Sequence, residues 1–140
     1  MTNSQYLQTN NYVNTNKLYA AFQFAGMINE INTKQYVVFA MDDSIWDNLT
    51  ASQVAWMNAS PANMRSVLGW QVATYCITYD GVNPIKGRSA PLAFNTLNGT
   101  VTYTAGGVGQ LDGTPVYIWD WFTSNGAVTI TDFIHPPVGH

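Results

Sequence analysis

Apolar residues in the first half of the chain recur at the spacing of a helix. Positions three and four residues apart predict one helix over 17–25 and a short second helix over 27–31. Gly26 interrupts the apolar pattern where the first of these helices is expected to end. The next apolar segment, 36–40, is a short run of β-forming residues and predicts a buried strand.

Polar residues then mark the expected starts of further helices. Asp42 or Asp43 can cap a helix that carries Ile45, Trp46 and Leu49. Two more helix starts are indicated by a threonine and a glutamine three residues apart and by a serine before a proline: Thr50 with Gln53, and Ser60 with Pro61.

Turn dipeptides become frequent after residue 75. Four of them follow: Asp80-Gly81, Asn98-Gly99, Asp112-Gly113 and Asn125-Gly126. The segments 100–104, 116–122 and 127–131 are rich in β-formers, and no long helical pattern separates them, so we expect antiparallel strands. A helical first half followed by such strands predicts an α+β fold class.

A chain of 140 residues has the size of one domain. We expect residues 1–16 to be a polar lead, residues 17–137 to form the single domain and residues 138–140 to be a tail. The first sixteen residues lack the basic and apolar regions of a signal peptide.

Composition narrows the classes of function. Five basic against eight acidic side chains give a net charge of −3, which cannot supply the basic surface that nucleic acid requires. No apolar run reaches the ~18–20 residues needed to cross a bilayer, so direct membrane insertion is not expected. Cys76 is the single cysteine, which excludes an intrachain disulfide and a thiolate metal cluster.

Residues suited to catalysis are sparse. Neither His135, beside two prolines, nor His140, the last residue, belongs to a catalytic motif. The glycine-rich segment 106–109 lacks the lysine of a phosphate-binding loop. The acidic cluster does not have the spacing of a calcium loop: Asp42, Asp43 and Asp47. We therefore expect a protein that is not an enzyme and that uses no cofactor or metal.

Two features indicate binding or modification. Tyr117, Trp119 and Trp121 alternate along one expected strand, so they would share a face and could form a platform for a sugar ring or a partner protein. The alternative is that these aromatic side chains belong to the core, which is their commoner place in a strand. Three glycosylation sequons begin at Asn48, Asn58 and Asn98.

The order of these motifs over about residues 16–137 resembles the fasciclin-like domain family. The segment 36–40 followed by Asp43 and Trp46 is similar to the family's first signature, with Trp46 in place of phenylalanine and Met41 in place of proline. Segment 96–99 resembles the family's threonine-leucine-x-glycine element. Asn125-Gly126, the strand after it and Asp132 resemble the closing signature.

One departure from the family lies at the end of the long helix. The family usually carries tyrosine-histidine there, with the histidine as a buried polar anchor, whereas this chain has Trp70-Gln71. We expect Gln71 to replace that histidine, since an amide both donates and accepts hydrogen bonds.

The resemblance implies a helical N-terminal half packed on a C-terminal antiparallel β wedge or sandwich. It also implies a non-catalytic adhesion or protein–protein interaction module, extracellular or on the cell surface, with a matrix or surface protein, or a glycan, as partner. The alternative is a ligand-binding module that takes a glycan or an apolar small molecule through the aromatic stripe.

Overall fold

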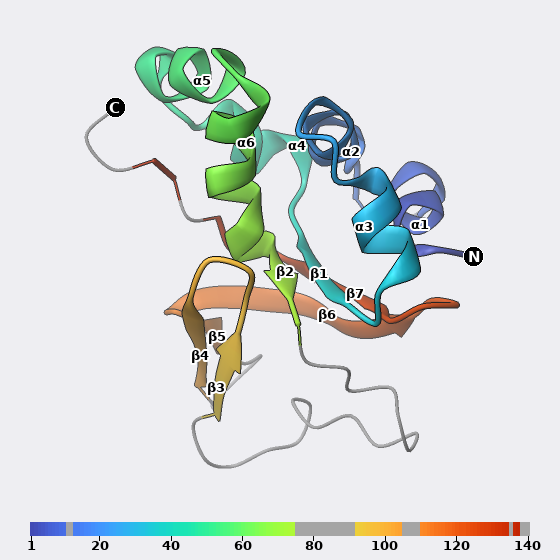
Figure 1. Ribbon diagram of the computed structural model, residues 1–140. Helices are drawn as coiled ribbons and strands as arrows, with labels where there is room; N and C mark the ends of the chain where they lie inside the picture. Colours follow the sequence, from blue (N-terminus) through green and yellow to red (C-terminus); the bar gives the residue numbers. More distant parts are fainter. Residues whose placement is uncertain (11–12, 75–91, 105–109, 135, 138–140) are drawn as a thin grey trace.

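The predicted helices and strands occur in the expected order, and the structure adds one helix at the start and three short strands, 72–73, 92–95 and 110–111. The computed structural model describes residues 1–10, 13–74, 92–104, 110–134 and 136–137 (Figure 1). The helices in this part of the chain are α1 (Asn3–Thr9), α2 (Asn16–Phe24), α3 (Ile28–Thr33), α4 (Asp43–Asp47), α5 (Ala51–Asn58), α6 (Pro61–Leu68) and the short 3₁₀ turn η1 (Gly69–Gln71). The strands are β1 (Val37–Ala40), β2 (Val72–Ala73), β3 (Leu92–Asn95), β4 (Thr100–Thr104), β5 (Gln110–Leu111), β6 (Thr114–Phe122) and β7 (Ala127–Thr131).

The strands form one hydrogen-bonded series in the order β2-β1-β7-β6-β5-β4-β3. Most pairs are antiparallel, as expected, but β1 runs parallel to β7, with Val38 opposite Val128. The strand from the helical half is thus inserted beside the last strand of the chain, so the sheet is mixed. The helices gather on one side of β1, β7 and β6, and the small strands β3, β4 and β5 lie at the far end of β6 (Figure 1). The α+β class is confirmed.

The core has two layers that share β1 and β7. Val38 and Ala40 of β1 pack among the helices together with Val128 and Ile130 of β7. The alternate β1 residues, Val37 and Phe39, pack on the other face, where the Phe39 and Phe133 rings meet edge to face with centroids 6.0 Å apart. Because both faces are covered, β1 is buried along its whole length, which explains its unbroken apolar run.

Side-chain caps set the starts of three helices as the sequence predicts. Asp42 caps α4 by accepting a hydrogen bond from the Ser44 backbone N–H. Thr50 and Gln53 form the predicted capping box of α5, and Ser60 caps α6 before its proline.

Helix α1 corrects the expectation that residues 1–16 are a polar lead. Thr2 and Gln5 form a second capping box, and Tyr6 and Leu7 are buried in the helix-side core. The first ten residues are therefore part of the folded unit. The signal was present, because Thr2 and Gln5 have the same spacing as the capping box of α5.

The connection at Asn125-Gly126 is not the two-residue turn with positive φ that an Asn-Gly dipeptide between strands commonly forms. Four residues, 123–126, connect β6 to β7, and neither Asn125 nor Gly126 has a positive φ. The predicted two-residue turn of the left-handed kind occurs instead at Asp112-Gly113, with φ of 48° and 82°. The expectations on Asp80-Gly81, Cys76, the segment 106–109, His135 and His140 lie outside the described residues.

Candidate functional site

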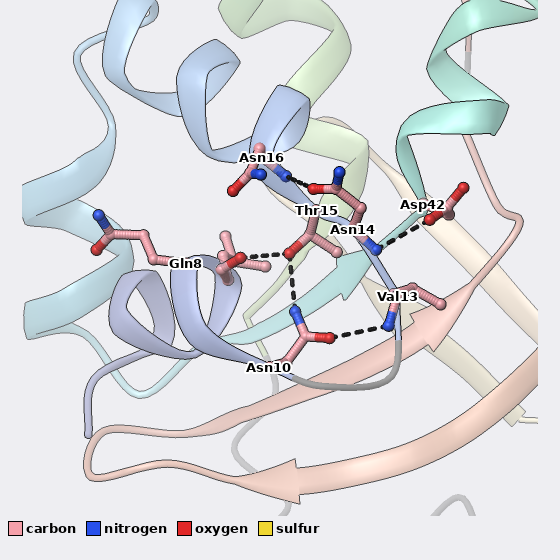
Figure 2. Close-up of a pocket in the computed structure, with 8 residues that line it drawn as sticks. Gln8, Asn10, Val13, Asn14, Thr15, Asn16 and Asp42 are labelled. Atoms are coloured by element: carbon pink, nitrogen blue, oxygen red, sulfur yellow. Dashed lines mark hydrogen bonds between the residues drawn. The ribbon is translucent and has the colours of Figure 1, made fainter.

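An open, polar pocket of about 460 Å³ lies where the loop between α1 and α2 meets the start of α4 (Figure 2). Most of the residues around it carry an amide, a hydroxyl or a carboxylate. They are Leu7, Gln8, Asn10, Val13, Asn14, Thr15, Asn16 and Asp42.

Hydrogen bonds fix the floor of this pocket. Thr15 is buried, and its hydroxyl donates to the backbone carbonyl of Leu7. The same hydroxyl accepts a bond of 3.0 Å from Asn10 Nδ2, and Asn10 Oδ1 accepts one of 3.1 Å from the Val13 N–H. The loop from residue 13 to residue 16 is thus tied to the C-terminal end of α1 (Figure 2).

Asp42 and Asp43 fix the other side of the pocket. Asp42 Oδ1 accepts from the Asn14 N–H at 3.0 Å, and the Asp43 N–H donates to the Asn14 carbonyl at 2.7 Å. Asp43 Oδ1 also accepts from the Lys17 N–H at 2.8 Å, in the first turn of α2. Hydrogen bonds from the Ser44 side chain, the Ser44 N–H and the Asn14 N–H lower the pKa of Asp42, so its carboxylate is ionised at neutral pH.

Three side chains at the rim keep unused hydrogen-bonding groups. Gln8, Asn14 and Asn16 are exposed. Within the described residues, Asn14 Oδ1 accepts a hydrogen bond from the Asn16 N–H, while Asn14 Nδ2 makes none. The side-chain amides of Gln8 and Asn16 make no hydrogen bond to the protein through either their nitrogen or their oxygen. Sequence reasoning passed over this site, although its signal is visible as the amide-rich stretch from residue 8 to residue 16.

A second, smaller cleft of about 270 Å³ is more apolar. Its lining comes from α2 and from the helices beside it: Lys17, Ala20, Ala21, Phe24, Trp46, Asn58 and Met64. Phe24, at 42% exposure, is one of two large exposed hydrophobic residues in the described part of the chain.

Charge is sparse on the described surface, and two ion pairs involve two of its three basic side chains. Lys17 forms an ion pair with Asp47, and Arg65 forms one of 2.7 Å with Glu30. Among the described residues, no group of three histidine, cysteine or acidic side chains could hold a metal ion. No helix there has the length and apolar character needed to cross a membrane.

The aromatic stripe lies on β6, but the strand is less regular than the prediction assumes. The pairing of β6 with β7 shifts between Val116 and Ile118 and again between Ile118 and Trp121. The side chains of Tyr117, Trp119 and Trp121 lie outside the described part, so the platform stays a prediction.

The three sequons differ in whether the side chain of the asparagine is free of contacts with the rest of the protein. Asn48 and Asn58 are exposed at the ends of α4 and α5. Asn98 is also exposed, but its Nδ2 donates to the Ser66 carbonyl, and a Cβ at Gly69 would lie 2.1 Å from its Oδ1. A glycan is therefore easier to accommodate at Asn48 and Asn58.

Gln71 is fully buried between the two core layers. Its Nε2 donates to the carbonyls of Phe39 at 2.7 Å and of Phe133 at 3.0 Å. Its Oε1 has no hydrogen-bond partner among the described residues. The amide joins β1 to the segment that follows β7, and it does so through its donor alone.

The closing motif gathers at the junction of β6, β7 and α1. Asn125 Nδ2 donates to the carbonyls of Ile31 and Lys34, both at 2.7 Å, and Asn125 Oδ1 accepts from the Asn3 N–H at 3.2 Å. A Cβ on Gly126 would lie 1.9 Å from the Tyr36 carbonyl oxygen. Asp132 is half-buried immediately after β7.

Comparison with known proteins gives a likeness of fold. No family profile and no curated protein matches the sequence. Among solved structures, the chain is similar to a FAS1 domain pair from the insect cell adhesion molecule Fasciclin I, with a TM-score of 0.57 and 17% sequence identity. The match covers 85% of this chain and 44% of that one, so the chain spans less than half the length of the domain pair. This protein has the fold of a fasciclin-like (FAS1) domain.

Proposed function

We propose that this domain is a non-catalytic adhesion or protein–protein interaction module that works outside the cell or on its surface. The observation that carries the proposal is the fold, which the chain shares with a FAS1 domain pair of a cell adhesion molecule. Extracellular matrix or surface proteins are the partners that this likeness favours.

The described surface has few basic side chains that could attract a charged partner. Its two ion pairs use two of the three described basic side chains, Lys17 and Arg65, and leave Lys34. Binding should therefore depend little on salt, because few exposed charges are available to be screened.

A single small domain offers a limited contact area. Useful interfaces begin near about 1,000 Å² of total burial, so one copy should bind with modest affinity. Adhesion then requires many copies, displayed together or repeated along a longer chain, because linked copies raise the effective concentration.

The test is to couple the domain to beads at several densities and to measure attachment to surfaces coated with matrix proteins. We expect attachment that rises steeply with density and that changes little between low and physiological salt. A heat-denatured sample on the same beads is the control for non-specific adsorption.

Attachment that collapses with modest salt would contradict the mechanism. Absence of attachment at every density, together with tight binding of one small molecule by the monomer, would support the ligand-binding alternative instead.

A further inference from the structure

The pocket between α1, α2 and α4 has the size and the chemistry of a small-molecule site. Its volume of about 460 Å³ is within the ~300–1,000 Å³ of typical ligand pockets, whereas the apolar cleft beside Phe24, at about 270 Å³, falls below that range.

The lining excludes an apolar occupant. A ligand that covered the unpaired amides of Gln8, Asn14 and Asn16 without hydrogen bonding to them would bind about tenfold more weakly for each buried group. An amide presents donors and an acceptor together, so its best counterpart is a group that also does both, and a hydroxyl is such a group.

The negative charge of Asp42 narrows the class of ligand further. Asp42 is the one charged side chain among the described lining residues, and its lowered pKa keeps it anionic, so an anionic ligand is repelled. A carboxylate offers about four lone-pair sites, and that of Asp42 already accepts from the Asn14 N–H, the Ser44 N–H and the Ser44 hydroxyl. The site that remains can accept from one hydroxyl donor of a ligand, and a single carboxylate is a poor basis for a divalent-cation site.

The pocket is also held in shape before any ligand arrives. The bonds from Asn10 to Thr15 and from Val13 to Asn10 fix one wall, and the bond from the Asn14 N–H to Asp42 fixes the other (Figure 2). Half-buried Val13 adds an aliphatic surface between these walls. A site fixed in this way loses little conformational entropy on binding.

We propose that this pocket binds one sugar unit of a neutral glycan, with Asp42, Gln8, Asn14 and Asn16 bonding to its hydroxyl groups and Val13 contacting its C–H face. The site goes beyond the proposed adhesion role and does not depend on it. A neutral sugar is the ligand class that satisfies the amides, tolerates the carboxylate and covers the valine at the same time.

The test is a titration of the whole domain, labelled for NMR, with neutral mono- and disaccharides. We expect shifts of the backbone amides of Asn10, Val13–Asn16 and Asp42, with a Kd of about 1 mM for a single sugar. Uronic acids of the same ring size should bind at least about tenfold more weakly because of Asp42.

A double variant, Gln8→Ala with Asn16→Ala, should weaken binding at least about tenfold, since these side chains make no protein hydrogen bond that folding could lose. Asn29→Ala is the matched control, because it removes an exposed amide on α3 that is not part of the pocket lining. Unchanged melting temperatures in both variants would show that the loss belongs to the site.

Three results would overturn the proposal. The first is that no neutral saccharide shifts the amide signals of the pocket at high millimolar concentration. The second is that neutral and anionic sugars bind equally well. The third is that the double variant binds sugar as well as the parent does. Shifts at Asp42 with calcium ions alone, without a response to sugars, would assign the pocket to a cation.

Discussion

The two turns on either side of β6 contain the same kind of dipeptide but depend on glycine for different physical reasons. Asp112-Gly113 joins β5 to β6, and both of its residues have positive φ. Gly126 ends the connection from β6 to β7 with an ordinary φ, and a Cβ there would lie 1.9 Å from the Tyr36 carbonyl oxygen.

The first turn is a local structure. A Cβ at Gly113 would meet no atom within 4 Å, so only the backbone conformation favours glycine. The Asp112 side chain strengthens the same turn by accepting from the Thr102 N–H at 2.8 Å.

The second turn is a junction of distant segments. Asn125 and Asn3 together bind the carbonyls of Ile31, Lys34 and Tyr36. The Ala127 N–H also donates to the Tyr36 carbonyl, which therefore cannot retreat from an added side chain without losing bonds. The comparison teaches that one sequence motif can serve local geometry in one place and close packing in another.

The largest effect is expected for Gly126→Ala. Its methyl group would overlap a carbonyl that two hydrogen bonds hold in place, so we expect a loss of about 3 kcal/mol in the free energy of unfolding. Denaturant unfolding of the purified domain measures it. Gly126→Asn should be no more stable than the alanine variant, because asparagine tolerates a left-handed φ but does not remove a steric clash. If the asparagine variant were clearly more stable than the alanine variant, glycine would be needed there for its backbone conformation and not for close packing.

Asn3→Ala tests whether α1 belongs to this junction. The side chain of Asn3 donates to the Ile31 and Tyr36 carbonyls at 3.0 and 3.1 Å and accepts from the Thr123 hydroxyl. The Ile31 and Tyr36 carbonyls would keep one donor each, from Asn125 and from the Ala127 N–H, so the cost is that of three lost hydrogen bonds, about 2 kcal/mol in thermal or denaturant unfolding. Gln8→Ala on the same helix removes an exposed side chain and is the control; equal effects of the two would argue against a specific tie.

Gln71→Leu probes a second long-range tie of the same kind. The Phe39 and Phe133 carbonyls would each lose a donor, while the removal of the unpaired Oε1 offsets part of the loss, so we expect about 1–2 kcal/mol. Gln71→His, which restores the residue usual in fasciclin-like domains, should recover part of this stability by donating to one carbonyl. A leucine variant as stable as the parent in denaturant would show that Gln71 contributes nothing net.

The features that sequence predicted well depend on neighbours close in the chain. The capping box of α5, the serine cap of α6 and the apolar run of β1 are each set within a few residues, and each forms as expected. The same rule applies to α1, whose capping box at Thr2 and Gln5 was visible in the sequence, although residues 1–16 were expected to be a polar lead.

The features that sequence did not predict depend on contacts between distant segments. Periodicity within 36–40 carries no information that β1 pairs in parallel with β7, because that register involves residues about ninety positions away. Likewise, the pocket forms only when Asp42 accepts from Asn14, a contact between two segments that the pattern treats separately. The amide-rich composition of residues 8–16 was visible, but its assembly around a carboxylate was not.

The smallest effect is expected for Gly113→Ala, which measures the cost of a positive φ at a position where the added methyl group meets no clash. Alanine at a φ of 82° is strained, but nothing lies within 4 Å of the new methyl group, so the free energy of unfolding should fall by about 1 kcal/mol. Gly113→Asn should recover much of that loss, because asparagine adopts the left-handed region more readily than alanine. The asparagine variants thus distinguish the two positions: asparagine should be more stable than alanine at residue 113 but not at residue 126. Chemical denaturation of all four variants under the same conditions measures the difference, and asparagine failing equally at both sites would remove the distinction between the two turns.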